Sequence, residues 1–149
     1  FDRFRKFGDF DLIVSNMSLH WSSDIYKLLE RILDSMRLNS IFLFTVPNNK
    51  SFSFFKDMKL RYVVNKFPET RSILKKIDKR FNFKQYECQF DESTFSPIQF
   101  LKNLKRIGAN VTNKSVDLRN LFSLRKFDHK KIKINYNINF FIIKKIKDV

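Results

Sequence analysis

The chain of 149 residues is long enough for one ordinary domain, and its 43% hydrophobic residues can supply a sizeable core. Its net charge of +15 favours an acidic partner, which could be nucleic acid, an anionic membrane surface or an acidic protein. A run of about 18 uncharged apolar residues occurs nowhere, which excludes a membrane-spanning helix.

The first three predicted elements form a βαβ unit. Residues 10–14 are a short apolar run, which predicts a strand buried on both faces of a parallel sheet. Apolar residues then recur at helical spacing over residues 25–36, after a candidate N-cap at Asp24. The apolar run 41–46 predicts a second strand that ends at Pro47. We expect the two strands to be parallel neighbours.

The middle of the chain is strongly basic. Residues 52–81 carry apolar positions at helical spacing on both sides of Pro68, which predicts two helices with a turn between them. Residues 83–90 alternate as a strand does, and we expect Cys88 within it to be a small buried residue. One cysteine and two distant histidines exclude an internal disulfide and offer no metal site, so we expect a cytoplasmic protein.

The C-terminal third is predicted to hold two helices and a last strand. Ser96 and Pro97 suit the N-cap and first turn of a helix, and Gly108 is placed to end it. A short helix is expected over residues 118–124. The apolar and aromatic residues of 132–146 predict the final strand. The element order favours a single α/β domain without internal repeats.

The candidate binding site follows the two strands of the βαβ unit. Ligands of open α/β sheets bind outside the carboxyl ends of the strands, and Ser15 and Asn16 stand at that point of the first strand. Leu19 and Trp21 follow as apolar cover, and Asn48 marks the same edge after the second strand. The sequence therefore predicts a small-molecule pocket here, with Asn16 either touching the ligand or bonding to its own backbone.

His20 lies in the same loop and has two readings. Its ordinary pKa near neutrality suits a general base, whereas its aromatic and apolar neighbours suit a residue that lines the pocket. The sequence leaves both readings open.

The segment FDLIVSNMSLHW at residues 10–21, followed by the helix and the strand at 41–46, resembles class I S-adenosylmethionine-dependent methyltransferases of the type 11 group. The helix containing LKRIGA and the segment YNINF at residues 136–140 are most similar to the malonyl-acyl-carrier-protein O-methyltransferases of biotin synthesis. The resemblance implies the C-terminal half of a Rossmann-like fold. Its sheet is mostly parallel, with helices on both faces and an antiparallel last strand.

The resemblance also implies a reaction. A methyl group would pass from S-adenosylmethionine to the carboxylate of a malonyl group held on acyl-carrier protein, an acidic partner. No catalytic base is assigned, because the carboxylate nucleophile is already ionised. The implied cofactor-binding residues are Ser15 and Asn16, and the implied substrate-pocket residues are Leu19, His20, Trp21 and Asn48.

The chain departs from the family pattern in its glycines. It has two, and no G-x-G, so the glycine-rich cofactor loop of the family has no counterpart here. We expect residues 1–149 to be one partial methyltransferase domain whose cofactor-binding half lies upstream of Phe1, and which is inactive alone. The family's glycine turn before the second strand is replaced by residues 36–40, where Asn39 can adopt the left-handed conformation.

Basic side chains are densest over residues 56–80, where they form either a solvated helical face or a docking surface for an acidic carrier protein. Two other functions stay open. The similar segments of a methyltransferase-like assembly factor of respiratory complex I imply a non-catalytic role. The charge alone allows a nucleic-acid-binding module, which we consider unlikely because no recognisable binding motif is present.

Overall fold

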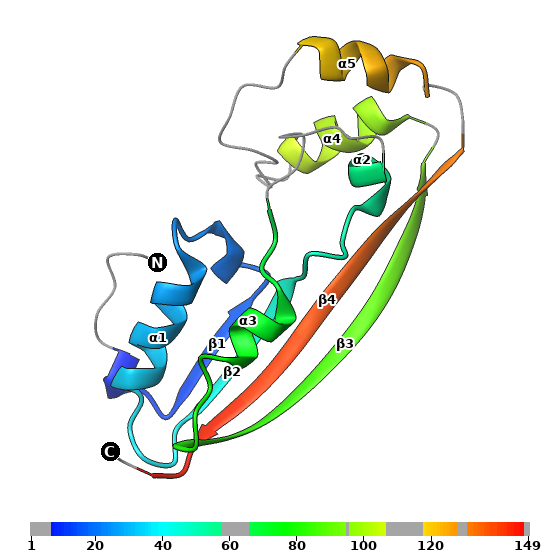
Figure 1. The fold of residues 1–149 in the computed structure, drawn as a ribbon. Helices are drawn as coiled ribbons and strands as arrows, with labels where there is room; N and C mark the ends of the chain where they lie inside the picture. The colour runs from blue at the N-terminus through cyan, green and yellow to red at the C-terminus, as the bar shows by residue number, and fades with distance from the viewer. Residues whose placement is uncertain (1–6, 58–65, 95, 107–117, 128–130, 148–149) are drawn as a thin grey trace. The chain divides into compact units, whose positions relative to one another are not determined.

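The computed structural model describes residues 7–57, 66–94, 96–106, 118–127 and 131–147 (Figure 1). In chain order the elements are η1 (Phe7–Asp9), β1 (Leu12–Asn16), η2 (Leu19–Trp21), α1 (Ile25–Ser35), β2 (Ile41–Pro47), α2 (Ser53–Asp57), α3 (Thr70–Leu74), β3 (Phe81–Thr94), α4 (Pro97–Arg106), α5 (Leu118–Arg125) and β4 (Ile132–Lys145). The chain divides into two compact units. Unit 1 comprises residues 1–49, 67–88 and 137–149, and unit 2 comprises residues 50–66 and 89–136.

The four strands form one sheet in the order β1-β2-β4-β3. β1 runs parallel to β2, with Leu12 opposite Ile41 and Asn16 opposite Thr45. β4 enters between β2 and β3 and runs antiparallel to β2. Both the parallel pair and the antiparallel last strand confirm the sequence prediction.

Helix α1 begins where the sequence predicts. The Asp24 Oδ1 atom accepts hydrogen bonds from the backbone N–H groups of Tyr26 and Lys27, both at 3.1 Å. These two bonds satisfy donors that the first turn of a helix leaves unpaired. The helix buries its apolar stripe, which consists of Ile25, Leu28, Leu29, Ile32 and Leu33.

The core of unit 1 lies between α1 and one face of the sheet. Phe44 of β2 stacks on Phe141 of β4, with ring centroids 4.6 Å apart, and on Phe42, with centroids 4.7 Å apart. The same core includes Ile73 of α3 and Phe81 at the start of β3. Helices α1 and α3 therefore cover the same face (Figure 1).

The prediction that the first strand is buried on both faces is wrong. Leu12 is 53% exposed and Val14 is 64% exposed, whereas Ile13 packs against the core. Ile142 of β4 is 40% exposed, because it follows the buried Phe141 along the strand and therefore points to the opposite face. Within the described part of unit 1 the helices lie on one face, and the opposite face of β1 carries apolar side chains into solvent.

Cys88 also differs from its prediction, because it is exposed in β3. Most residues of β3 that the structure describes are exposed, including Phe83, Tyr86 and Phe90. Alternation along a strand indicates the face of each residue, but it does not indicate whether that face is covered.

The turn between α1 and β2 is closed by the last strand. The backbone N–H of Asn39 donates to the carbonyl of Lys145 at 2.9 Å, and the N–H of Lys145 donates to the carbonyl of Ser40 at 3.1 Å. The buried Lys145 Nζ also donates to the carbonyl of Met36, the C-cap of α1, at 2.7 Å. A cation at this place complements the partial negative charge of the helix C-terminus.

Unit 2 packs around aromatic side chains. Phe52 contacts Phe55, Phe100 and Tyr136 with ring centroids 5.0 to 6.4 Å apart, all in edge-to-face geometry. Phe55 and Phe100 are buried, which holds α2 against α4. The Ser96 Oγ accepts from the Gln99 N–H at 3.2 Å, which confirms the predicted N-cap of α4.

Two of the predicted helices are short where the structure describes them. Helices α2 and α3 stand on either side of Pro68, as predicted, but each has five residues. Residues 58–65, which belong to the first of these predicted helices, and Gly108, the predicted end of α4, lie outside the described residues. In the described ranges, no helix combines the length and apolarity that crossing a membrane requires.

Asn39 has a backbone φ of 65°, which confirms the left-handed conformation predicted for this turn. A β-branched residue is strained there, so we expect Asn39→Val to lower the free energy of unfolding by about 1–2 kcal/mol. Asn39→Gly should keep or slightly raise it. Urea unfolding followed by circular dichroism measures both. Equal stability of the two variants would contradict the role of this turn.

Candidate functional site

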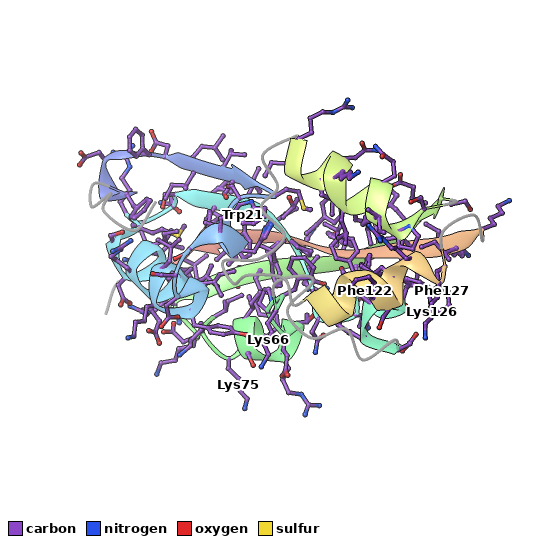
Figure 2. All side chains as sticks on the ribbon, turned by 90° about the horizontal axis from the view of Figure 1, so that it is seen from above. Trp21, Lys66, Lys75, Phe122, Lys126 and Phe127 are labelled. Atoms are coloured by element: carbon purple, nitrogen blue, oxygen red, sulfur yellow. The ribbon has the colours of Figure 1, made fainter. Side chains whose placement is uncertain are left out.

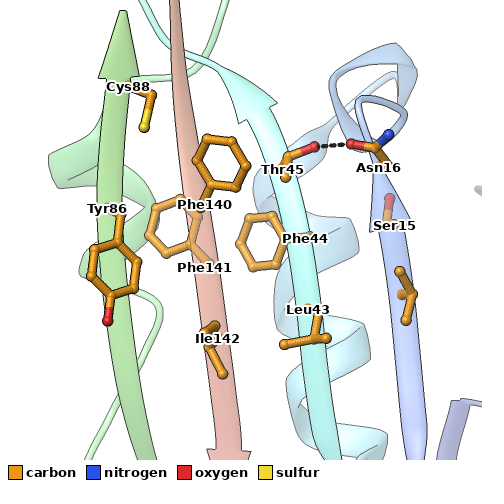
Figure 3. A pocket seen from close by; sticks show the side chains of 11 residues that line it. Ser15, Asn16, Leu43, Phe44, Thr45, Tyr86, Cys88, Phe140, Phe141 and Ile142 are labelled. Atoms are coloured by element: carbon orange, nitrogen blue, oxygen red, sulfur yellow. Dashed lines mark hydrogen bonds between the residues drawn. The ribbon is translucent and has the colours of Figure 1, made fainter.

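The carboxyl ends of β1 and β2 are joined by Thr45. Its Oγ1 donates to the Asn16 Oδ1 at 2.6 Å (Figure 3). The same Oγ1 accepts from the Met17 N–H at 2.9 Å, and the Thr45 carbonyl accepts from that N–H at 3.1 Å. Met17 has a φ of 48°, a conformation that costs energy in a non-glycine residue. Thr45 thus holds the chain in a sharp, strained turn directly after β1.

The two predicted cofactor-binding residues lie at this turn but face opposite sides of the sheet. Ser15 is buried, and its Oγ lies 2.6 Å from the Oγ of Ser18. Asn16 is exposed, and its side-chain oxygen is engaged by Thr45. The amide nitrogen of Asn16 has no hydrogen bond among the described residues, so it is the group of this pair that can donate to a ligand.

The loop after β1 turns through η2, where Leu19 is buried and Trp21 is 40% exposed. The His20 ring lies 4.6 Å from the Trp21 ring and 5.6 Å from the Phe67 ring, centroid to centroid. Burial lowers the pKa of His20 from 6.5 to about 4. His20 is therefore neutral near pH 7, enclosed by two aromatic rings.

The Nδ1 atom of His20 is buried and has no hydrogen-bond partner among the described residues. A neutral imidazole offers one donor and one acceptor nitrogen, and a buried polar atom without a partner is costly. This atom can therefore bond to a polar group of a bound molecule. A ring with a pKa of about 4 is a weak base, which favours the pocket-lining interpretation of His20 over the general-base interpretation.

Asn48, the predicted substrate-pocket residue after β2, is fully buried. Its Nδ2 lies 3.5 Å from the Asn139 Oδ1, which also accepts from the Gln85 Nε2 at 3.1 Å. The Asn139 Nδ2 donates to the Thr70 Oγ1 at 2.8 Å. These bonds tie the end of β2 to β3, β4 and α3, so Asn48 belongs to a buried network rather than to the loop around His20.

A groove of about 610 Å³ lies on the sheet face that the helices leave uncovered (Figure 3). Of the predicted site residues it includes only Ser15 and Asn16. Its lining residues are Val14, Ser15, Asn16, Leu43, Phe44, Thr45, Tyr86, Cys88, Phe140, Phe141 and Ile142. The groove is apolar except at the strand ends, and thus differs in place and chemistry from the loop that holds His20 and Trp21.

The structure adds residues that the sequence did not single out. Thr45 is the one polar residue in an otherwise apolar strand, and that contrast is a signal that could have marked it. Phe67 and Asn139 carried no such signal, because their contacts come from segments far along the chain. Groups of three or more metal-ligating side chains are absent from the described residues.

A search of protein-family models finds no match. The chain is 29% identical over 117 residues to the malonyl-[acyl-carrier protein] O-methyltransferase of Neorickettsia risticii (strain Illinois). This match covers 72% of the chain and 44% of the relative, so the chain spans less than half the length of that protein.

Two solved structures have the same fold. A protein of Bacillus halodurans C-125 assigned as a methyltransferase superimposes with a TM-score of 0.58, at 9% identity, over 97% of this chain and 68% of its own. This chain has a methyltransferase fold. The YcgJ protein of Bacillus subtilis agrees, with a TM-score of 0.56 at 11% identity over 98% of this chain and 68% of its own. The resemblance implied this fold with its parallel strands and antiparallel last strand, and the described part of the sheet has one parallel pair, β1 with β2, and the antiparallel β4.

The lowered pKa of His20 predicts a specific pH dependence. Between about pH 6.5 and pH 4 the unfolded chain binds a proton at His20 that the folded chain does not, so stability falls as the pH falls through this window. We expect the wild-type chain to lose about 1 kcal/mol more than His20→Gln between pH 7 and pH 5. Urea unfolding at both pH values measures this. Equal losses in the two proteins would contradict a buried, neutral His20.

Proposed function

We propose that this chain is the C-terminal part of an S-adenosylmethionine-dependent methyltransferase that methylates the carboxylate of a malonyl group on acyl-carrier protein. The match to the Neorickettsia risticii malonyl-[acyl-carrier protein] O-methyltransferase carries the proposal. The methyltransferase fold supports it, because it puts Asn16 and the loop 17–21 at the carboxyl end of a parallel strand, where ligands of such sheets bind.

In this proposal the chain's own residues position the reactants. S-adenosylmethionine, when bound, would supply an electrophilic methyl group, and the malonyl carboxylate would need no base because it is already ionised. The Asn16 amide, held by Thr45 at the end of β1, would donate to the cofactor, and His20 and Trp21, in the loop that follows, would line the substrate side and exclude water there. Alignment in a water-poor pocket is sufficient to accelerate such a transfer strongly.

The charge of the chain supports an acidic carrier as the partner. In the basic stretch the structure pairs Lys76 with Glu30 at 2.6 Å and Arg80 with Asp34 at 2.9 Å, so these two side chains stabilise α1. Arg71 of α3 and Lys75, the C-cap of that helix, are exposed and one helical turn apart, and Lys75 points away from the ribbon (Figure 2). We assign the docking of the acidic carrier to these exposed residues.

The activity is tested in a fusion that supplies the part of the fold beyond this chain. The N-terminal part of the Neorickettsia risticii relative, up to the matched segment, is joined ahead of Phe1, and methyl transfer from labelled S-adenosylmethionine to malonyl-carrier protein is measured. We expect transfer, and a loss of about tenfold or more in kcat/KM for Asn16→Ala. The matched control Asn82→Ala changes an exposed asparagine at the start of β3 and should retain the rate.

A folded fusion that binds S-adenosylmethionine but does not methylate malonyl-carrier protein, under conditions where the intact relative does, would contradict the proposed substrate. A folded fusion without cofactor binding would contradict the proposed cofactor.

Carrier docking is tested separately in the same fusion. Reversing the charge in the double variant Arg71→Glu/Lys75→Glu should raise the KM for malonyl-carrier protein about tenfold, because it repels an acidic surface. The KM for the malonyl thioester of a short neutral thiol should not change. Lys84→Glu/Lys147→Glu, which reverses two other exposed lysines, is the control. Equal effects of the two double variants would place the docking surface elsewhere.

A further inference from the structure

The end of β1 carries a relay of two hydrogen bonds that runs in one direction. The Met17 N–H donates to the Thr45 Oγ1 at 2.9 Å, and this hydroxyl lies 2.6 Å from the Asn16 Oδ1. A backbone N–H can only donate, so the Thr45 oxygen accepts at Met17. The single hydrogen of the Thr45 hydroxyl then points to Asn16, whose side chain accepts it.

The length of the second bond identifies the atom of Asn16 that faces Thr45. A hydroxyl and an acceptor oxygen lie about 2.5–3.0 Å apart, whereas an amide nitrogen and an acceptor oxygen lie about 2.7–3.2 Å apart. The separation of 2.6 Å therefore belongs to an O–H···O bond, with the side-chain oxygen of Asn16 toward Thr45. Figure 3 shows the amide nitrogen on the side away from Thr45.

The backbone around the relay is strained and held in place. Met17 has a φ of 48°, and its N–H also bonds to the Thr45 carbonyl at 3.1 Å. Both acceptors belong to one residue of β2, which lies opposite Asn16 in the parallel pair. Strain of this kind persists only where neighbouring groups compensate it, and it is common at ligand sites. The orientation of Asn16 is thus fixed by the pairing of β1 with β2.

The Asn16 amide nitrogen is a donor in uncharged surroundings. It has no hydrogen bond among the described residues, and its side chain is exposed. Residues 12–21 and 41–48, which form both strands and the loop after β1, include no Asp or Glu. An ammonium group would find no acidic partner in these segments. A carboxylate, in contrast, accepts hydrogen bonds strongly and meets no like charge there.

We infer that Thr45 is a specificity-determining residue, which fixes Asn16 as a hydrogen-bond donor and so makes the end of β1 a binding site for a carboxylate. Thr45 acts through Asn16, so it is a positioning residue. The identity of the ligand rests on the proposed function, in which two reactants carry a carboxylate: the methionine portion of S-adenosylmethionine and the malonyl group. Ligands that lack one carboxylate or the other separate these two sources.

The direction of the relay is measured in the 149-residue chain without any ligand. A side-chain carbonyl that loses a hydrogen bond moves its ¹³C resonance upfield. We expect Thr45→Val, which removes the hydroxyl but keeps the branched shape, to move the Asn16 Cγ resonance upfield. Thr45→Ser keeps the hydroxyl and should leave the resonance in place. Thr45→Ala replaces the valine variant if that variant does not fold. An unchanged resonance in the folded variant would overturn the relay.

The preference for a carboxylate is measured by calorimetric titration of the same fusion that tests the proposed function. We expect Asn16→Ala to weaken binding of S-adenosylmethionine about tenfold to a hundredfold, because a hydrogen bond to a charged group is lost. Binding of decarboxylated S-adenosylmethionine should hardly change. Thr45→Val should show the same contrast in smaller measure, and Thr45→Ser should bind as the wild type does. A purely structural defect would weaken both compounds equally.

Two further variants sharpen the comparison. Asn16→Asp keeps the shape of the side chain but replaces the donor by a negative charge, so it should weaken S-adenosylmethionine more than Asn16→Ala does and should not weaken the decarboxylated compound. Thr70→Val is the matched control, because Thr70 of α3 also bonds to an asparagine, Asn139, at 2.8 Å. Its variant should leave the ratio of the two affinities unchanged.

The outcomes separate this inference from the proposed function. Variants that weaken malonyl-carrier protein but not acetyl-carrier protein, and treat both cofactor compounds alike, uphold the carboxylate site and identify the malonyl group as its ligand. Equal weakening of ligands with and without a carboxylate overturns the inference and leaves the proposed function in place. Discrimination between carboxylates in a fusion that transfers no methyl group upholds the inference and contradicts the proposed reaction. A folded fusion that binds none of these compounds overturns both.

Discussion

The arrangement of unit 1 depends on the burial of one face of β2. Its side chains Phe42, Phe44 and Val46 are almost fully buried, and they anchor α1 above the sheet. Both edges of the same strand are paired, with β1 in parallel and β4 in antiparallel orientation. Once β2 is fixed in this way, the end of β1 must meet Thr45, and the strained turn at Met17 follows from that meeting.

The local features of the fold could be predicted from the sequence because their causes are local. The caps at Asp24 and Ser96 each bond to residues two or three positions onward, and the left-handed turn at Asn39 depends on one side chain. The exposure of β1 could not be predicted in the same way. An apolar run indicates that its residues will be covered, but it does not indicate that the cover belongs to the same 149 residues.

The candidate site also combines features that the sequence predicts with features that depend on distant segments. Ser15 and Asn16 form the carboxyl end of β1 and Trp21 lies in the loop after it, close to where the sequence predicts them, because strand ends can be located from the pattern. It did not predict that Phe67 enclose His20, or that Asn139 engage Asn48, since these partners come from distant segments. The neutral state of His20 follows from its burial by those tertiary contacts, so it could not be predicted from the sequence.

The bond between Lys145 and Met36 has a consequence for how the chain folds during synthesis. The C-cap of α1 obtains its buried cation from the last residue of β4, and β4 also separates β2 from β3. The whole segment from Met36 to Lys145 must leave the ribosome before these two groups can meet, and contacts so distant in sequence form slowly. During that interval β2 has one unpaired edge and α1 lacks its C-terminal partner. The nascent chain therefore exposes an unpaired strand edge until β4 has been synthesised, and exposed strand edges favour aggregation during synthesis.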